Sequence, residues 1–566
     1  MTAARAWCSR WYAPLTYLLL ALLGHLPAFR SLPTNTRCVC RDTPQTDWFL
    51  GWTPHALWAG HAPWTTRHLA APEGVNLMWN TLLPLPGLLM APVTAAGNVL
   101  VTHTLLSVLG FALSATSMWW VVRRWAPWGP ARFAAGLLYG FSPYVVAQGT
   151  DHLNLQLVAL PPLVLLCLDE LLVRQRRRAV VGGLLLGLVA LAQLLTTEEV
   201  LASTFIVSAV GLGVLVLQNR SRLDRPRVRH AGRGLLTAAG VLTVGAAWPL
   251  SIQLAGHRPV TGPVTDVSRF GADLLGPFVP GPHQLLGFDA IHSWGGGSTE
   301  NGSYLGLPLV ALLAVLSWRY RRVPVVRFAS VTAMVVGVLS LGRKLAVAGT
   351  TYDIPLPFAA FQNVPLLQDL SAVRLSLYVA LLTALLLAVG LDRLHAEGLL
   401  QPRRGLAVAL LVAVPLLPQW PYHFERAGTP AFFTSGDVRK IPRDAVALTY
   451  PVPRFPSSEP MQWQALSGYR YRSVGGYLIT PDESGRGTFR GGKTTWERIT
   501  AQAAVGRGVQ LYNPGSAMQL RLEMKRLDVR AVVIADRLGS DAVIELMTMI
   551  LGRPGERTGG VTVWYL

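Results

Sequence analysis

The chain has 566 residues, of which 51% are hydrophobic and only 14% are charged, and its formal net charge is +20. The charged fraction lies far below the soluble norm of about 25%, and the mean hydropathy is +0.37, so the composition excludes a disordered chain and a soluble nucleic-acid-binding protein. It indicates a polytopic membrane protein. The four cysteines are too few for a disulfide framework and have no zinc-binding spacing.

The first apolar segment follows Arg5 and Arg10 and has no small-residue cleavage site, so it predicts a transmembrane anchor and not a removed signal peptide. The prolines near 81–93 favour a segment at the membrane interface over a full span. A span needs about 20 mostly apolar residues, and this rule predicts about eleven spans in all. After the anchor at about 14–29, they lie near 98–121, 131–148, 154–173, 179–196, 200–218, 235–254, 303–318, 328–342, 373–391 and 405–419.

The distribution of charge predicts the orientation of these spans. With a cytoplasmic N-terminus, the inner segments hold 22 basic residues against five acids, while the outer segments before residue 419 hold nine basic residues and twelve acids. Most of the positive charge is therefore an orientation signal. The pattern predicts a multi-pass protein of the cell membrane with its C-terminal tail outside the cytoplasm.

Function is expected on the outer face because the long connections lie there. The first outer loop spans 30–97, and two others span 257–302 and 343–370. From residue 419 the hydropathy falls, and the pattern predicts strands at 445–449, 474–479, 529–534 and 561–566 and helices at 517–527 and 541–551. We therefore expect two parts: an all-α transmembrane domain over 1–418 and a small extracytoplasmic α/β domain over 419–566.

Two acids in the first outer loop are candidates for chemistry. Asp42 lies just after the first span, where a carboxylate is suited to act as general base toward an attacking hydroxyl. Asp47 is a secondary candidate, and the alternative for it is an N-cap of a helix that starts near Trp48. His55, His61 and His68 share this loop, but their spacing fits no metal motif, so no metal ligand is assigned.

Further candidates lie at the outer ends of other predicted spans. Glu198 and Glu199 occupy a short outer turn, where two adjacent acids repel each other. Arg374 opens the tenth predicted span and is suited to hold a phosphate, the alternative being an arginine that reaches toward lipid headgroups. Asp151 and His152 follow the third span, and Glu300 and Tyr304 mark the entry to the eighth; these four are candidates for orienting an acceptor, or for a polar turn and a helix cap.

Several stretches together resemble a known group of membrane proteins. They are Asp42 to Trp52, Pro54-His55-Ala56-Leu57, Pro72-Glu73-Gly74-Val75-Asn76-Leu77, Trp79-Asn80-Thr81, Gly140-Phe141-Ser142-Pro143-Tyr144, His152-Leu153-Asn154-Leu155 and Glu198-Glu199. In these the chain resembles actinobacterial multi-pass glycosyltransferases and, more broadly, the GT-C superfold. The resemblance covers most of the membrane part and only loosely the tail.

The resemblance implies that a sugar passes, with inversion, from a polyprenyl-phosphate-linked donor to an envelope glycan, lipid or protein acceptor on the outer face. It implies that Asp42 is the base and Asp47 an additional acid. The residue chemistry adds Arg374 for the donor phosphate and Glu198, Glu199 and His152 around the acceptor, with membrane lipids but no nucleic acid as partners. No cofactor is fixed, and a divalent cation stays open. The alternatives are a transporter or flippase of a lipid-linked saccharide, and a non-catalytic membrane scaffold.

Overall fold

The structure is a computed structural model, and it describes residues 2–39, 42–220, 224–262, 264, 267–364, 367–400, 402–489, 494–506, 509 and 514–566. The chain forms two compact units. The first, the helical unit, comprises Met1–Arg30, Leu105–Ala246 and Asp266–His423, and the second, the mixed unit, comprises Ser31–Thr104, Ala247–Thr265 and Phe424–Leu566. Two of the five boundaries between the units fall inside helices, one in α6 (Val99–Val122) and one in α13 (Arg225–Ala255).

Prolines start many helices of the helical unit, because the fixed φ of proline suits the first turn and its missing N–H is not needed there. The helices with such a proline include α2 (Leu26–Phe29), α7 (Gly129–Gly140), α8 (Pro143–Gln148), α10 (Pro161–Leu168), α14 (Leu307–Arg319) and α15 (Pro324–Ser340). Helix α17 (Pro402–Ala413) also begins at a proline, and the others are α1 (Thr2–Gly24), α9 (Leu153–Gln156), α11 (Ala179–Leu194), α12 (Glu198–Gln218) and α16 (Ser376–Ala396). A π-helical turn, Asp169–Arg174, continues α10, and β4 (Lys344–Val347) pairs with β5 (Thr350–Pro355).

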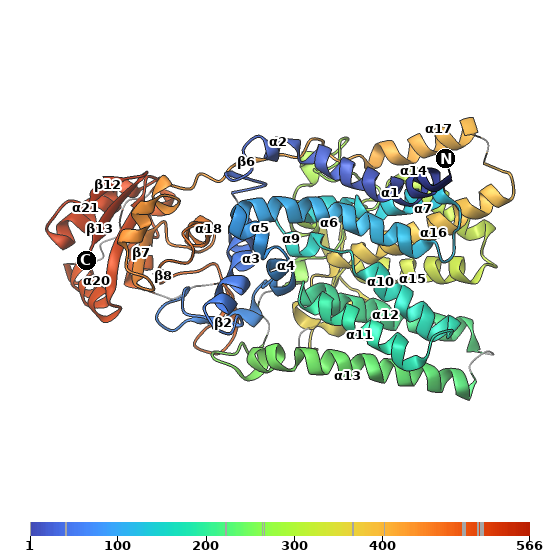
Figure 1. The fold of residues 1–566 in the computed structure, drawn as a ribbon, viewed down its shortest axis with the longest axis horizontal. Coiled ribbons are helices and arrows are strands. Elements are labelled where there is room, and N and C mark those ends of the chain that lie inside the picture. The colour runs from blue at the N-terminus through green and yellow to red at the C-terminus, as the bar shows by residue number, and fades with distance from the viewer. Residues whose placement is uncertain are drawn as a thin grey trace. The chain divides into compact units, whose positions relative to one another are not determined.

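Helix α16 forms the centre of the helical unit and packs against α7 and α15 (Figure 1). Of its most apolar 18-residue window, 89% is buried inside the protein, whereas the corresponding fraction of α13 is 17%. An apolar helix that is exposed to this extent is typical of a lipid-facing position. The arrangement is therefore a buried central helix with apolar helices at the periphery.

Among the described residues, five helical segments are long and apolar enough to cross a membrane, and five shorter apolar helices accompany them. The predicted count of eleven spans is not confirmed by these lengths and stays a prediction. The long segments are Val99–Val122, Leu153–Arg174, Glu198–Gln218, Arg225–Ala255 and Ala372–Ala396. The shorter ones are Trp11–Gly24, Ala179–Leu194, Leu307–Arg319, Pro324–Ser340 and Gly405–Leu416.

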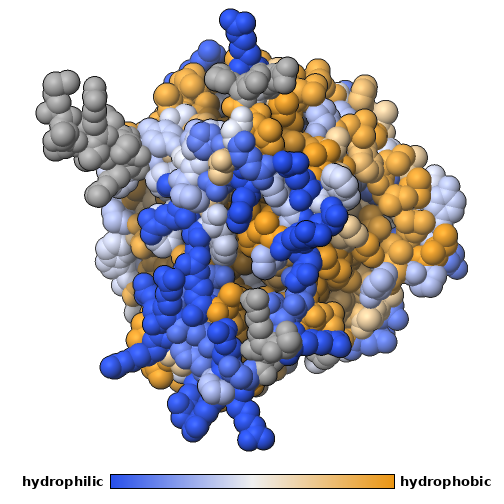
Figure 2. All heavy atoms as spheres, turned by 90° about the vertical axis from the view of Figure 1, so that its right-hand side faces the viewer, coloured by the Kyte–Doolittle hydropathy of each residue, from blue (hydrophilic) through white to orange (hydrophobic). Residues whose placement is uncertain are grey.

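Hydrophilic side chains gather on the end of the helical unit where α16 connects to α17, as Figure 2 shows. The predicted inner loops supply exposed arginines, among them Arg123, Arg176, Arg321 and Arg393. Apolar helices that end in arginine-rich loops match the pattern expected at a cytoplasmic membrane surface. The orientation itself remains a prediction.

The mixed unit contains a five-stranded sheet with the order β12-β13-β11-β7-β8, in which β11, β7 and β8 are parallel and β13 is antiparallel to both of its neighbours, β11 and β12. Successive residues of β11 alternate between two hydrophobic clusters, one with α20 and α21 and one with α18. Helices thus cover both faces of the sheet. The elements are β7 (Val446–Tyr450), β8 (Arg472–Ser473), β11 (Val529–Ala535), β12 (Glu556–Thr558), β13 (Val561–Tyr565), α18 (Glu459–Leu466), α19 (Thr495–Thr500), α20 (Pro514–Arg526) and α21 (Ser540–Leu551).

The first outer loop belongs to the same compact unit as the C-terminal sheet. It contains α3 (Asp42–Trp58). Two six-residue helices lie in and just after the segment near 81–93, where the prolines disfavoured a full span. Three small two-stranded ladders complete the unit, and one of them joins the first outer loop to the chain just before the sheet. The elements are α4 (Pro84–Leu89), α5 (Ala91–Ala96), β1 (Asn35–Thr36), β6 (Glu425–Arg426), β2 (Thr65–Thr66), β3 (Val75–Asn76), β9 (Thr480–Pro481) and β10 (Gly487–Thr488).

The strand predicted at 474–479 is wrong, because this segment bonds to the first outer loop and not to a neighbouring strand. Gln45 Nε2 donates to the carbonyl of Tyr477 at 2.5 Å, and the backbone N–H of Ile479 donates to Asn80 Oδ1 at 2.7 Å. These two backbone groups are therefore satisfied by side chains, and the carbonyl of Gly475 accepts from the backbone N–H of Ala70 in the same loop. The other three predicted strands and both helices of the tail are confirmed to within a few residues.

Candidate functional site

A buried ion-pair centre in the helical unit surrounds Arg374, which lies in the 3-10 turn Ala372–Leu375 directly before α16. Its Nε lies 3.0 and 3.1 Å from the two carboxylate oxygens of Glu300, and one terminal nitrogen also bonds to Glu300. The other terminal nitrogen forms an ion pair with Glu199. One guanidinium therefore holds two carboxylates from segments far apart in the sequence.

Helices α12 and α16 fix the two sides of this centre. Glu199 stands in the first turn of α12, where the helix dipole favours a negative charge. About one turn after Arg374, the hydroxyl of Tyr378 lies 2.8 Å from the hydroxyls of both Ser203 and Thr204 on α12. These buried hydrogen bonds hold α12 against α16 and so keep Glu199 within reach of Arg374.

A buried glutamine connects the centre to His152. Gln148 ends α8 and is 1% exposed; its Nε2 donates to Glu300 at 3.1 Å, and its Oε1 lies 2.7 Å from Nδ1 of His152. An ionised carboxylate only accepts hydrogen bonds, so the Glu300 contact turns the amide oxygen of Gln148 toward His152. His152 Nδ1 is then the proton donor in this contact, and Gln148 fixes the orientation of the imidazole.

The charge of the centre follows from the state of Glu300. Burial alone raises the pKa of this carboxyl, but the positive charge and hydrogen bonds of Arg374, with smaller effects of His152 and Gln148, lower the pKa below its ordinary value. Glu300 is therefore a carboxylate at neutral pH. Together with Glu199, it gives the Arg374 centre a formal charge of −1 when His152 is neutral, so the centre as it stands attracts cations more than phosphates.

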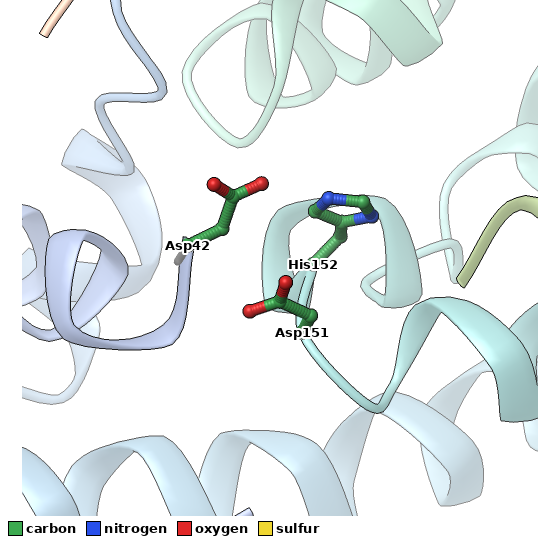
Figure 3. Close-up of side chains that lie close together, drawn as sticks. All are labelled: Asp42, Asp151 and His152. Atoms are coloured by element: carbon green, nitrogen blue, oxygen red, sulfur yellow. The ribbon is translucent and has the colours of Figure 1, made fainter. Parts of the chain in front are cut away.

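The turn between α8 and α9 presents the next two predicted residues. Asp151 and His152 are adjacent and half-buried, and His152 is the residue just before α9 (Figure 3). Figure 3 also shows Asp42, the first residue of α3 in the mixed unit. Asp42 is half-buried as well, so its carboxylate lies near the protein surface.

Asp47 has a different role from either of those predicted for it. It lies inside α3, fully buried, and its two carboxylate oxygens lie 2.7 Å from Nδ1 of His103 and 2.7 Å from Nε2 of Gln462. The N-cap interpretation is wrong because α3 begins at Asp42, one and a half turns earlier than the predicted start. Asp47 instead fastens α3 to α6 and α18.

The remaining predicted residues fall into two groups. Glu199 and Glu300 join the Arg374 centre, and Glu300 is not a helix cap because Gly306 precedes α14. Glu198 stands beside Glu199 in the first turn of α12, and the buried Tyr304 packs its hydroxyl beside Gly306. Sequence reasoning missed Gln148, although its spacing of four residues from His152 is that of neighbours on one helix face.

Solved structures of two kinds of enzyme share this fold. The arabinofuranosyltransferase AftD from Mycobacteria superposes with a TM-score of 0.57 at 14% identity, covering 98% of this chain and 40% of that one. The apo oligosaccharyltransferase of Archaeoglobus fulgidus gives 0.52 at 14% identity, covering 92% and 69%. The same archaeal enzyme, AglB, with an inhibitory peptide and a dolichol-phosphate gives 0.51 at 12% identity, covering 99% and 75%. The chain thus spans less than half the length of AftD.

These similarities identify a GT-C-like fold, as the resemblance implied, in a chain rich in apolar helices. The model of the family described as "Domain of unknown function (DUF6311)" matches residues 15–420, which is more than half of the chain. The protein belongs to this family. No curated protein matches the sequence.

Proposed function

We propose that this protein is a membrane glycosyltransferase that moves a sugar from a polyprenyl-phosphate-linked donor to an envelope glycan, lipid or protein acceptor. The observation that bears this proposal is the GT-C-like fold, which extends over 98% of the chain in the superposition with an arabinofuranosyltransferase. The dolichol-phosphate in the AglB complex supports a lipid-linked donor. A lipid-linked donor also suits apolar helices with an ion-pair centre at the end of α16.

In the proposed reaction, the oxygen of an acceptor hydroxyl attacks the anomeric carbon from the face opposite the phosphate. Asp42 takes the hydroxyl proton, the bond from the anomeric carbon to the phosphate oxygen breaks, and the polyprenyl phosphate leaves with the electron pair, so the configuration inverts. The half-buried position of Asp42 suits this role. Asp47, in contrast, is fully buried and its carboxylate oxygens are bonded to His103 and Gln462.

Arg374 is the proposed ligand of the donor phosphate, and its contacts suggest how it is made available. A guanidinium has five N–H groups, and the bonds to Glu300 and Glu199 leave two of them. Glu300 binds through both oxygens and its side chain is 3% exposed, whereas Glu199 binds through one oxygen and is 25% exposed. We propose that the phosphate displaces Glu199 and leaves Glu300 in place.

Asp151 and His152 are the proposed ligands of a divalent cation. A carboxylate and an imidazole are a common donor pair for Zn²⁺ and Mn²⁺, and Gln148, which also donates to Glu300, holds the ring of His152 through Nδ1. A cation bound there would supply a Lewis acid for the phosphate oxygens of the donor. The chain's own contribution is to hold the tautomer of His152 through Gln148.

The test is an assay of Asp42→Asn in proteoliposomes with a radiolabelled polyprenyl-phosphate sugar and a membrane-envelope acceptor fraction. We expect the initial rate to fall at least a hundredfold, because the amide cannot take the proton. Glu545→Gln, at an exposed position of α21, is the matched control and keeps the wild-type rate. Full activity of Asp42→Asn would contradict the assignment of the base. Movement of the labelled lipid across liposomes without a new glycosidic bond would identify a flippase instead.

A further inference from the structure

The mixed unit contains a surface pocket that the proposed reaction does not use. Its volume is about 70 Å³, and it lies where the C-terminal half of α3 meets the chain around β7 and α18. The pocket is several times larger than the space that one water needs, so it is large enough for one edge of a small ring. The side chains that define its chemistry are Trp52, His55, His68, Arg443, Asp444 and Tyr469.

One wall of the pocket is aromatic and rigid. The rings of Trp52 and Tyr469 lie 5.5 Å apart, and His55 stands 4.5 Å from Tyr469. The polar atoms of both large rings are bonded within the protein: Tyr469 donates its hydroxyl to the carbonyl of Trp48 at 2.7 Å, and Trp52 Nε1 donates to the carbonyl of Pro63 at 3.0 Å. Trp52 is 3% exposed and Tyr469 is 5% exposed, so what these two rings offer to a ligand is a small apolar surface held in place.

The rest of the pocket offers donors and acceptors side by side. Arg443 only donates hydrogen bonds, and Asp444 accepts them and lies 3.1 Å from Nε2 of His68. Burial, with the charges of His68 and Arg443, lowers the pKa of His55 to about 4, so His55 is neutral at physiological pH. A neutral imidazole supplies one donor and one acceptor.

This combination excludes two simple ligands. A phosphate would meet the carboxylate of Asp444, and a metal ion would meet the guanidinium of Arg443. A ligand that is apolar on one face and carries groups along its edge that both donate and accept hydrogen bonds matches all side chains that line the pocket. A sugar ring has this chemistry.

We propose that this pocket binds one sugar ring of a glycan, at a distance from the reacting hydroxyl. Trp52 follows Asp42 by ten residues on the same helix, which corresponds to about 15 Å along α3. If Asp42 is the base, an inference that rests on the proposed function, the ring in the pocket belongs to a remote part of an acceptor longer than one sugar. Binding energy from such a remote ring positions the hydroxyl that reacts.

Binding is testable without turnover. The full-length protein in detergent is titrated with linear tetrasaccharides of mannose, glucose, galactose and arabinofuranose, and binding is followed by saturation-transfer NMR and calorimetry. We expect at least one tetrasaccharide to bind, and Arg443→Ala and Asp444→Asn each to weaken it about tenfold, since each removes a hydrogen bond to a charged group. Arg439→Ala, at a nearby exposed arginine, is the matched control. Binding of no tetrasaccharide, or equal binding by all variants, would overturn the proposal.

The transfer assay separates this inference from the proposed function. Arg443→Ala and Asp444→Asn should raise KM for a tetrasaccharide acceptor about tenfold at unchanged kcat, and leave KM for a methyl glycoside acceptor unchanged. Glycan binding that persists in a protein with no transferase activity would refute the enzyme and retain the pocket. Equal losses for short and long acceptors would refute the remote subsite and retain the enzyme. Unchanged melting temperatures of both variants exclude unfolding as the cause.

Discussion

At Arg374, two carboxylates share one guanidinium unequally. Glu300 chelates it from a nearly inaccessible position, while Glu199 contacts it with one oxygen. The other oxygen of Glu199 is buried without a hydrogen bond among the described residues. An unsatisfied carboxylate oxygen costs free energy, so Glu199 is the partner that an incoming phosphate displaces more readily.

Glu199→Gln is therefore expected to improve donor binding. The substitution removes one negative charge beside Arg374 and keeps the shape of the side chain, so KM for the lipid-linked donor should fall about three- to tenfold. Glu300→Gln should instead reduce activity, since it loosens both Arg374 and Gln148. Initial rates at varied donor concentration measure the donor KM and the activity of both variants. An unchanged or higher donor KM in Glu199→Gln would show that phosphate does not exchange with Glu199.

His55 makes the stability of the mixed unit depend on pH. Its pKa is about 4 in the folded protein because of burial and nearby positive charges, and about 6.5 in an unfolded chain. Between these values the unfolded chain binds more protons, so folding stability falls as the pH drops from 6.5 toward 4. The charged or titratable groups that face His55 are His61, His68, Arg443 and Asp444.

The variant His55→Gln should flatten this dependence. We expect the unfolding midpoint of the wild type to fall more steeply between pH 7 and pH 5 than that of His55→Gln. Glu497 acts in the opposite direction, because burial raises its pKa to about 7, but it is common to both proteins and cancels in the difference. Thermal unfolding followed by tryptophan fluorescence at half-unit pH steps gives the two slopes. Parallel slopes would contradict a neutral, half-buried His55.

At the scale of elements, α7 crosses α6 in close contact at Gly140. A Cβ at this position would stand 2.5 Å from the Cβ of Ala115 and also press on the backbone of Ala115. Gly140→Ala should therefore destabilise the protein by about 1–3 kcal/mol through overpacking. Gly213→Ala in α12 is the control, because nothing lies within 4 Å of its added Cβ and alanine favours a helix. Melting temperatures in detergent compare the two, and equal shifts would contradict the close packing.

Elements were predictable where one physical signal dominated. A long apolar segment such as α16 is recognised from its hydropathy alone. The residue pattern of β11 and β13 predicts strands buried in a sheet. Helix α3 was placed too late, because thirteen of its residues are buried on all sides and polar and apolar residues therefore show no helical period. The residue pattern of 474–479 is typical of a strand, but the hydrogen bonds of this segment to Asn80 and Gln45 determine its conformation.

At the scale of the whole molecule, the sequence indicated most members of the site but not their arrangement. Arg374, Glu300 and Glu199 are each conspicuous in the sequence because a charged residue at the end of an apolar span is costly without a function. Their pairing joins positions up to 175 residues apart, and no local pattern encodes such a contact. Gln148 was missed for the same reason, since its importance lies in its two partners.

The predicted topology depends on the two short helices of the first outer loop. Helices α4 and α5 have six residues each, so each spans only about 9 Å and neither crosses a bilayer of about 30 Å. Without a span there, every predicted inner loop is basic and the C-terminal sheet lies outside the cytoplasm. One more span would place the arginines of all later inner loops outside.

Cysteine labelling distinguishes the two arrangements. In a background without accessible native thiols, Met518→Cys in α20 should react with a membrane-impermeant maleimide on intact cells, because Met518 is 57% exposed. Arg321→Cys, in the exposed connection between α14 and α15, should react only after permeabilisation. The reverse pattern would mean an even number of spans before the C-terminal sheet. The sheet and the proposed glycan pocket would then lie in the cytoplasm, where an extracytoplasmic acceptor has no access to them.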